Sequence, residues 1–153
     1  VAVSVRKGFR EQDFARLHPG GKIGRRFLTV GELMHAGAAM PTVATGTPLK
    51  DVIYEMSRKG LGMTTVQDAD GRLLGVVTDG DLRRLMERDP DPMARTAGEV
   101  MHSGGVTIDA GELATAALRL LEERRITSLM VTDPDQKVLG VLHLHDLWGV
   151  GLF

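Results

Sequence analysis

The stretches GVVTDGDL (Gly75–Leu82) and GVLHLHDL (Gly140–Leu147) decide the fold, because each joins an apolar run to a short polar segment that ends in Asp-Leu. A short apolar run flanked by turn residues is typical of a buried strand, and an acidic residue soon after it is typical of the first turn of a helix. The chain therefore contains the same strand-to-helix junction twice. Thr78 occupies one position of the first copy, and His143 occupies the matching position of the second.

The repeat extends well beyond this junction. TVGELMH (Thr29–His35) returns as TAGEVMH (Thr96–His102), and DGRLLGVVTDGDL from Asp70 returns as DQKVLGVLHLHDL from Asp135. Two matched blocks in the same order indicate a tandem duplication, and self-similarity of this kind identifies the repeating structural unit. Each unit is too small to bury much apolar surface alone, so we expect the two to pack sheet against sheet into one domain.

Each copy also contains a predicted amphipathic helix, because apolar residues recur at helical spacing. In the first copy these residues are Leu49, Val52, Ile53 and Met56. In the second copy they are Leu113, Ala116, Ala117 and Leu120. Pro48 suits the first turn of the first helix, and Thr47 is the candidate N-cap.

Strands and a second helix complete each unit. An extended stretch precedes the amphipathic helix, at Pro41–Ala44 in one copy and Val106–Ile108 in the other. The dipeptide Asp70-Gly71 is typical of a tight hairpin, so two strands follow the helix. Asp79 or Gly80 then begins a helix that includes residues 82–86. The sequence predicts the order β-α-β-β-α, twice.

The composition is that of an ordinary globular domain. The chain has 153 residues, 42% hydrophobic and 25% charged, with a formal net charge of −1 and no cysteine. It lacks the basic surface that non-specific nucleic-acid binding requires, the thiols of disulfides, and an apolar run that could span a membrane. We therefore expect a cytoplasmic protein without a nucleic-acid or membrane partner. Because Val1 starts in the middle of an apolar pattern, the chain is expected to be part of a longer one.

These features resemble a pair of cystathionine β-synthase (CBS) motifs, which are β-α-β-β-α units ending in Gly-apolar-apolar-Thr/Ser-x-x-Asp. GVVTDGD fits this pattern fully, whereas GVLHLHD departs from it at the hydroxyl position. The resemblance implies an α+β fold in which two tandem motifs form one pseudo-two-fold Bateman module that senses an adenosyl nucleotide. It places the first motif at residues 29–92 and the second at 93–153, after an upstream segment at 1–28.

The junction suits a nucleotide chemically. Unpaired N–H groups at the start of a helix attract anions, Thr78 can donate to a phosphate, and Asp81 can accept both hydroxyls of a ribose diol. With the base in the crevice between the sheets, the resemblance implies the nucleotide-binding residues Pro41, Thr42, Leu61, Gly62, Met63, Thr78, Asp79, Asp81, Val106, Ile126, Thr127, Ser128, His143, His145 and Asp146. The alternative is that Thr78 and Asp79 only cap a helix and that Asp81 is a solvated acid.

The second copy carries a pair of histidines. Read as a strand, HLHD places His143 and His145 on one face, with Asp146 close behind. Two histidines and a carboxylate form a ligand set for zinc or iron, but no third histidine is near in the sequence, so we predict neither a metal site nor a cofactor. We expect the imidazoles to contact an anion or a sugar carboxylate instead.

The segment before the repeat, DFARLHPGGKIGRR, is similar to the linker that joins the sugar isomerase domain to the CBS pair in D-arabinose-5-phosphate isomerases. It contains glycines and a lysine, but the Walker spacing of a phosphate-binding loop is absent. The resemblance implies that His18 contributes to catalysis only in the full-length enzyme, which interconverts ribulose 5-phosphate and arabinose 5-phosphate for Kdo and lipopolysaccharide synthesis. This chain by itself is not expected to be an enzyme.

Three functions remain open at this point. The favoured one is allosteric regulation by a nucleotide, either AMP or ATP or the pathway end product CMP-Kdo. The second is a scaffold that only holds isomerase subunits together, since CBS pairs associate into dimers and the apolar segment LWGVGLF (Leu147–Phe153) supports an interface. A homodimer through the motifs and a higher homo-oligomer of the full-length enzyme are expected. The third is an independent metal-dependent enzyme around His143.

Overall fold

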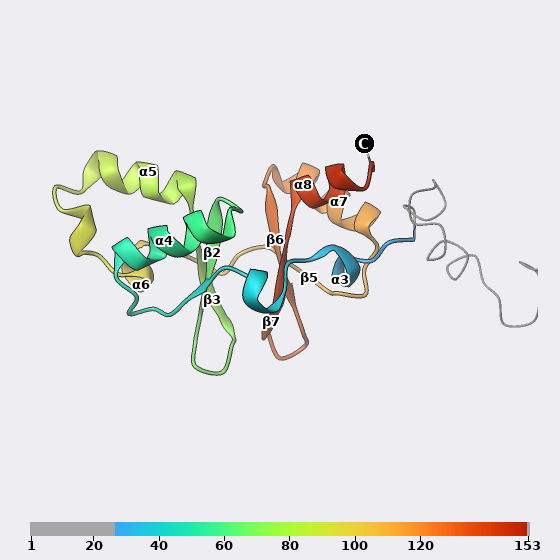
Figure 1. The fold of residues 1–153 in the computed structure, drawn as a ribbon, viewed down its shortest axis with the longest axis horizontal. Coiled ribbons are helices and arrows are strands. Elements are labelled where there is room, and N and C mark those ends of the chain that lie inside the picture. Colours follow the sequence, from blue (N-terminus) through green and yellow to red (C-terminus); the bar gives the residue numbers. More distant parts are fainter. Residues whose placement is uncertain (1–26, 153) are drawn as a thin grey trace, which may run out of the picture.

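The computed structural model describes residues 27–152, so His18 and the basic linker lie outside the described residues. The first half contains α3 (Val30–Leu33), the 3₁₀ turn η2 (Gly37–Ala39), β1 (Thr42–Val43), α4 (Leu49–Lys59), β2 (Met63–Gln67), β3 (Leu73–Thr78) and α5 (Asp79–Arg88). The second half contains η3 (Pro92–Ala94), α6 (Ala97–Val100), β4 (His102–Ser103), β5 (Thr107–Ile108), α7 (Ala114–Arg124), β6 (Ser128–Thr132), β7 (Val138–His143) and α8 (Leu144–Gly149). The predicted α+β class and the doubled β-α-β-β-α order are confirmed (Figure 1).

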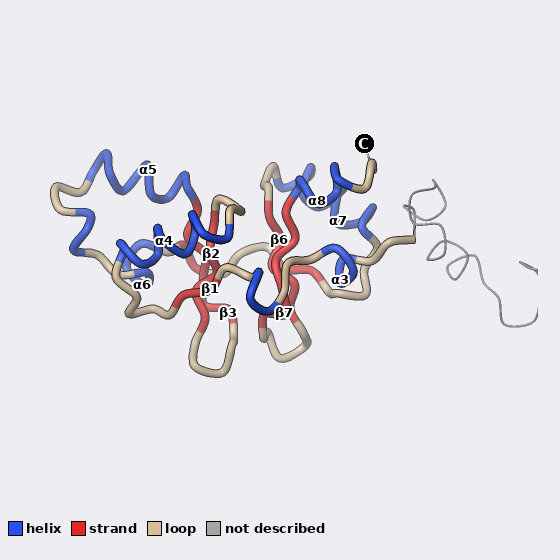
Figure 2. Tube along the Cα trace, viewed as in Figure 1, coloured by secondary structure: helices blue, strands red, loops and turns tan. Residues whose placement is uncertain are grey.

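Two small sheets form the centre of the molecule, and the longer helices lie outside them (Figure 2). One sheet has the strand order β1-β2-β3-β4 and the other β5-β6-β7. In both, the first two strands are parallel and the hairpin strands are antiparallel. Between the sheets, the buried side chains of Met63, Val76, Met130 and Val141 form a shared apolar layer. This layer joins the two motifs into one unit.

The short block at the start of each copy packs into the other copy. Val30 of α3 is buried in the core of the second motif, and Ala97 of α6 is buried in the core of the first. Figure 1 accordingly shows α3 beside α7 and α6 beside α4. The backbone of His102 pairs with Val76, and that of His35 pairs with Val141. The predicted motif boundaries therefore follow the repeat in the sequence, whereas each hydrophobic core contains residues from both copies.

Two glycines permit this crossing. A Cβ atom at Gly75 would lie 2.6 Å from the His102 carbonyl oxygen, and one at Gly140 would lie 2.8 Å from the His35 carbonyl oxygen. Both distances are shorter than van der Waals contact with backbone atoms that cannot easily move. The glycine that opens each GVV or GVL stretch is thus required by the chain that passes over it.

The predictions for the amphipathic helices were wrong in two details. The buried stripe of α7 consists of Ala114, Ala117 and Leu121, so Ala117 was predicted correctly, whereas Leu113, Ala116 and Leu120 are not among its fully buried residues. This stripe matches Leu49, Val52 and Met56 of α4. Thr47 is not the N-cap, because Pro48 takes that position and the Thr47 hydroxyl accepts a hydrogen bond from Ala44 in the preceding turn. Within residues 27–152, no helix has both the length and the apolar character needed to cross a membrane.

Candidate functional site

A cleft of about 920 Å³ lies where the two strand-to-helix junctions meet. It is lined by Leu61, Gly62, Met63, Val76, Thr78, Asp79, Gly80, Arg83, His102, Gly105, Val106, Arg125, Ile126, Thr127, Ser128, Met130 and His143. Small-molecule sites in proteins usually have volumes of roughly 300–1,000 Å³. The cleft is therefore large enough for a nucleotide, and both motifs contribute to its walls.

The structure brings most of the predicted binding residues together in this cleft. These are Leu61, Gly62, Met63, Thr78, Asp79, Val106, Ile126, Thr127, Ser128 and His143. The predicted residues that do not line it are Pro41, Thr42, Asp81, His145 and Asp146. Lining residues that the sequence reasoning missed include Arg83, His102 and Arg125. A signal for His102 was present, because it ends the repeated block, but nothing in that block indicates which sheet it joins.

The first junction is a capping box. The Thr78 hydroxyl accepts a hydrogen bond from the Asp81 N–H, and Asp81 Oδ2 accepts from the Thr78 N–H at 2.9 Å. The Thr78 hydroxyl also lies 3.0 Å from Asp81 Oδ2, to which it can donate. Reciprocal pairing of this kind satisfies the free N–H groups at a helix start. The geometry thus shows the capping role that the sequence left as the alternative for Thr78.

Asp81 has further partners. Its Oδ2 lies 2.9 Å from His102 Nδ1, and its Oδ1 accepts from Arg84 at 2.8 Å. Burial tends to raise the pKa of this carboxyl, but the hydrogen bonds from Thr78, Arg84 and His102 outweigh that effect and hold the pKa below its usual value. Asp81 is therefore ionised and engaged by protein donors rather than solvated.

Asp146 occupies the same place in the second motif. It accepts from the His143 N–H at 2.8 Å, and its other oxygen lies 2.7 Å from His35 Nε2. The histidine that ends each repeated block thus meets the aspartate that ends the junction of the other copy. Two crossed His–Asp pairs, His102–Asp81 and His35–Asp146, join the motifs beside the cleft.

His143 is the last residue of β7 and the N-cap of α8, so the expectation that His143 and His145 share one strand was wrong. The two rings still lie close, with centroids 4.4 Å apart, because the helix begins between them. The His145 N–H donates to His143 Nδ1 at 3.0 Å, which leaves Nε2 to carry the proton of the neutral ring. Burial, followed by the neighbouring His145, lowers the pKa of His143. Both the hydrogen bond at Nδ1 and the lowered pKa favour the neutral ring of His143, which lines the cleft.

No group of three or more His, Cys, Asp or Glu residues within positions 27–152 has an arrangement that could hold a metal ion. Asp146 is turned toward His35, and His143 Nδ1 is occupied by a backbone N–H. The arrangement gives no support to an independent metal-dependent enzyme.

Ser128 contributes a buried side-chain oxygen to the wall of the cleft that has no protein partner. Its hydroxyl oxygen is buried, and no hydrogen bond to it is formed. In the sheet, Ser128 lies directly opposite His143. Most buried hydroxyl groups are paired, because an unpaired one costs desolvation free energy. A buried hydroxyl that lines a cleft and has no partner is available to a bound molecule.

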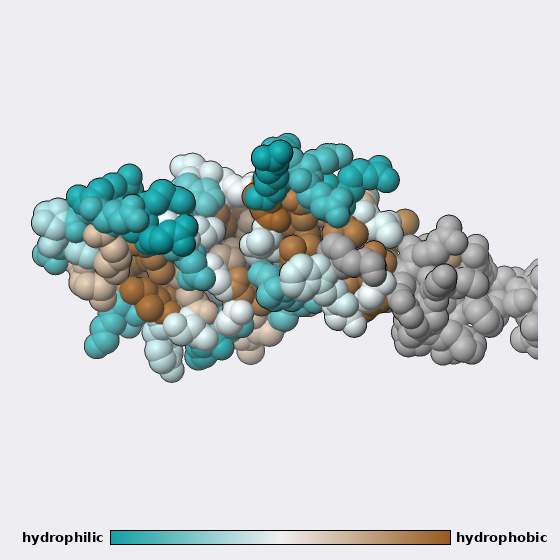
Figure 3. Space-filling model, turned by 90° about the horizontal axis from the view of Figure 1, so that it is seen from above, coloured by the Kyte–Doolittle hydropathy of each residue, from teal (hydrophilic) through white to brown (hydrophobic). Residues whose placement is uncertain are grey.

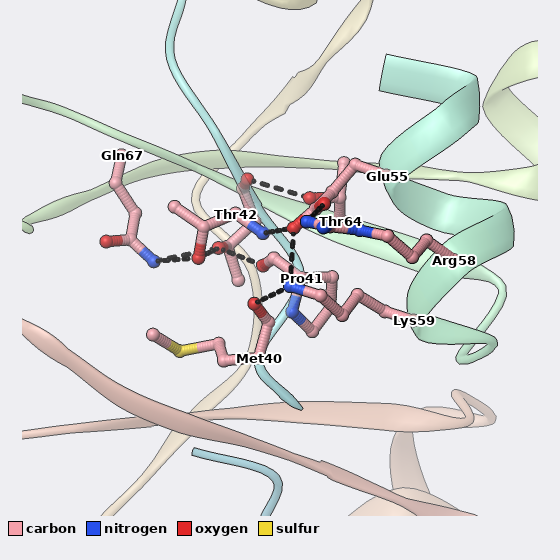
Figure 4. A network of polar contacts seen from close by, with 9 residues as sticks. Met40, Pro41, Thr42, Glu55, Arg58, Lys59, Thr64 and Gln67 are labelled. Carbon is pink, nitrogen blue, oxygen red and sulfur yellow. Dashed lines mark hydrogen bonds and ion pairs between the residues drawn. The ribbon is translucent and has the colours of Figure 1, made fainter. Parts of the chain in front are cut away.

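Pro41 and Thr42 belong to a separate polar network beneath α4 (Figure 4). Glu55 accepts hydrogen bonds from the Thr42 N–H and from Lys59, both at 2.9 Å, and from Arg58 at 2.7 Å. Burial tends to raise the pKa of Glu55, but these donors lower it below its usual value. The Pro41 carbonyl accepts from the Thr65 hydroxyl at 2.7 Å. The backbones of Pro41 and Thr42 thus take part in this network, and nucleotide contacts from these two residues stay a prediction.

Comparison with known proteins places this geometry in a family. The CBS domain family matches residues 30–88 and 97–147. The arabinose 5-phosphate isomerase KdsD of Pseudomonas aeruginosa is 44% identical over 99% of this chain, and that of Escherichia coli is 43% identical. The chain spans about half the length of these curated relatives, 47% and 46% respectively.

Solved structures share the fold. CBSX2 in complex with AMP has a TM-score of 0.70 and 26% identity, and the match covers 82% of this chain and 96% of that one. The CBS domain pair of MJ0100, in complex with 5′-methylthioadenosine and S-adenosyl-L-methionine, has a TM-score of 0.72, with 81% and 95% covered. At 15% identity, the second likeness supports the fold alone.

Proposed function

The chain belongs to the CBS domain family, and on that premise we propose that its paired motifs bind an adenine nucleotide in the cleft and thereby regulate a sugar-phosphate isomerase. The observation that carries this proposal is a cleft of nucleotide size lined by both motifs, with the buried, unpartnered hydroxyl of Ser128 in its wall. The AMP complex of the similar protein CBSX2 supports the choice of an adenine nucleotide.

The walls of the cleft suit the parts of a nucleotide. Leu61 and Met63 from one motif and Val106 and Ile126 from the other provide apolar surface for a planar base. Ser128 and the neutral His143 supply hydrogen-bonding groups for the sugar. Ribose contacts from the carboxylates of Asp81 and Asp146 remain a prediction. To make them, the carboxylates would give up hydrogen bonds that they form with protein donors in this structure.

The parent enzyme is proposed to be an arabinose-5-phosphate isomerase that serves Kdo and lipopolysaccharide synthesis, with His18 contributing to its active site. Identity of 44% to an arabinose 5-phosphate isomerase over nearly the whole chain supports this assignment. Binding in the cleft would act on the isomerase domain through the linker before Phe27, with a coupling free energy typically of about 1–3 kcal/mol. A cytoplasmic location remains a prediction, as does CMP-Kdo as an alternative ligand.

The proposal is tested by calorimetry and thermal melting of the 153-residue chain with AMP, ATP, CMP and CMP-Kdo. A ligand that binds only the folded state at about 100 times its Kd adds about 2.7 kcal/mol of stability, so the Tm must rise. We expect AMP or ATP to produce this rise. If only CMP-Kdo binds, the ligand of the cleft is CMP-Kdo and not an adenine nucleotide. If none of the four binds at millimolar concentration, the proposed sensing function is refuted.

Ser128→Ala tests the carrying observation directly. Removing a buried hydroxyl without a partner should leave the free protein as stable as before or slightly more so, because a desolvation cost disappears. Nucleotide affinity should fall about threefold to tenfold, the value of one neutral hydrogen bond. Ser103→Ala, at an exposed position, is the control. Equal nucleotide affinity of the two variants would show that Ser128 does not contact the nucleotide.

A scaffold role remains the second candidate, because apolar side chains project from the helical side of the molecule. Tyr54 of α4 is 64% exposed, Trp148 of α8 is 51% exposed and Met86 of α5 is 47% exposed. Figure 3, which looks onto this side, shows hydrophobic atoms among the hydrophilic side chains of both halves. The predicted homodimer would cover such groups. Light scattering that gives a monomer mass at micromolar concentration would count against it.

A further inference from the structure

Two arginines that line the cleft have no ion-pair partner among residues 27–152. Arg83 comes from α5 of the first motif, and Arg125 immediately follows α7 of the second. Other arginines nearby are engaged, for example Arg84 with Asp81. A guanidinium group has five donors arranged to grip a carboxylate or phosphate, so two unpaired ones in one cleft are available for an anion.

The backbone of Arg125 supplies an independent indication. Arg125 has φ 54° and ψ 47°, which is the left-handed region. The matching position of the first motif is Gly60, which adopts that region at φ 74°. Only glycine occupies this conformation without a steric cost, so the second motif accepts strain to place a long cationic side chain here. Strain of this kind at the wall of a cleft points to function.

The charge of the cleft favours an anion. Among the described residues that line it, Asp79 carries the one carboxylate, against the guanidinium groups of Arg83 and Arg125. The pseudo-two-fold counterparts of these arginines are Trp148 and Gly60, which do not line the cleft. The pseudo-two-fold axis that relates the motifs therefore does not relate these cationic groups to equivalent ones in the cleft. A ligand with an anionic group at one end has one favoured orientation in it.

We infer that Arg83 and Arg125 form an anion clamp that binds the phosphate group of the ligand and selects phosphorylated nucleotides over uncharged nucleosides. This inference rests on the proposed nucleotide site and assigns its specificity. Each guanidinium can form charge-assisted hydrogen bonds to phosphate oxygens, one from each motif. A phosphate held by both would also bridge the motifs, which a nucleoside cannot do in the same way.

The test is calorimetric titration of adenosine, AMP and ATP into the wild-type chain, Arg125→Gly and Arg83→Ala. The wild type should bind AMP at least tenfold more tightly than adenosine. Each substitution should weaken AMP binding about tenfold while leaving the affinity for adenosine within twofold. Raising the salt concentration should reduce the affinity for AMP more than that for adenosine.

The chain offers a matched control for backbone strain. Gln136 is the other non-glycine residue with positive φ in the described range, at 67°, and it lies outside the cleft. Arg125→Gly and Gln136→Gly should both preserve folding and raise or maintain the Tm, because glycine suits the left-handed region. Only Arg125→Gly should lose the preference for AMP.

The outcomes separate the clamp from the proposed function. If AMP and adenosine bind the wild type equally, or if Arg125→Gly and Arg83→Ala both bind AMP like the wild type, the clamp is refuted and nucleotide binding stands. If neither AMP, ATP nor adenosine binds the wild type at millimolar concentration, the proposed function fails, and the clamp fails with it.

Discussion

The first and second strand-to-helix junctions have similar backbones but different capping side chains. Thr78 has φ −114° and ψ 166°, and His143 has φ −106° and ψ 148°. In both, the N-cap side chain accepts a backbone N–H and an aspartate three residues later accepts the N–H of the cap. A hydroxyl and a neutral imidazole can therefore both cap the helix, but of these two capping side chains only the imidazole titrates between pH 5 and 8.

The interiors of the two motifs differ more strongly. Glu55 of α4, 8% exposed, is held by Arg58, Lys59 and the Thr42 N–H. The matching residue of α7 is Leu120, which packs against the apolar core. The same helix position is thus filled by a charged network in one motif and by apolar contact in the other. The architecture tolerates either, provided that each buried polar group has its partners.

The largest effect is expected from Glu55→Ala. This change leaves Lys59, whose side chain is 12% exposed, without its carboxylate. Removing one partner of a buried ion pair typically costs about 3–5 kcal/mol, and partial exposure places this case near 3 kcal/mol. Urea unfolding measures the loss. Glu123→Ala, on the exposed face of α7, is the control and should change stability by less than about 0.5 kcal/mol.

The loss of unfolding free energy caused by Glu55→Ala should also depend on pH. The pKa of Glu55 is lower in the folded chain than in the unfolded one, so its contribution is present above pH 4.5 and is lost as the pH falls toward the folded pKa. The difference between wild type and Glu55→Ala should narrow in that range. A difference that is constant from pH 7 to pH 3 would show that the ion pairs are not its source.

A smaller effect is expected where the copies cross. Gly75→Ala and Gly140→Ala should each cost about 1–3 kcal/mol, because the new Cβ overlaps the carbonyl oxygen of His102 or His35. Gly46→Ala is the control, since a Cβ atom at this position would have no such neighbour within 4 Å and its φ is not left-handed. Similar losses in both motifs would confirm that the crossings are equivalent. Equal stability of Gly75→Ala and Gly46→Ala would contradict the tight crossing.

The smallest effect concerns the two junctions. Folding lowers the pKa of His143 below 6.5, so the unfolded chain binds its proton first as the pH falls. Stability from this residue is therefore complete above about pH 6.5 and declines as the pH drops toward the folded pKa. His143→Thr, which copies the first junction, should flatten this part of the stability profile between pH 7.5 and 5. Thr78→Ser should leave the stability profile unchanged. If the stability of His143→Thr declines with falling pH as much as that of the wild type, groups other than His143 cause the decline.

The amino-acid sequence by itself determined the doubled β-α-β-β-α order, the hairpins and the strand-to-helix junctions, because periodicity, turn residues and capping chemistry act over a few neighbouring residues. The resemblance to the CBS family, rather than the repeat alone, implied that Thr78, Ser128 and His143 share one site, and all three line the cleft. The sequence did not show whether Ala114 or Leu113 belongs to the buried stripe, because both are apolar and the helical period tolerates a shift of one residue.

Only the tertiary structure decided the histidine partners of Asp81 and Asp146 and the charge of the cleft. Asp146 is held by a histidine 111 residues away in the chain, and no local pattern encodes that contact. Arg83 and Arg125 likewise belong to different motifs and line the same cleft only after the sheets have packed together. Such contacts depend on long-range packing, in which each short block of the repeat crosses into the core of the other copy.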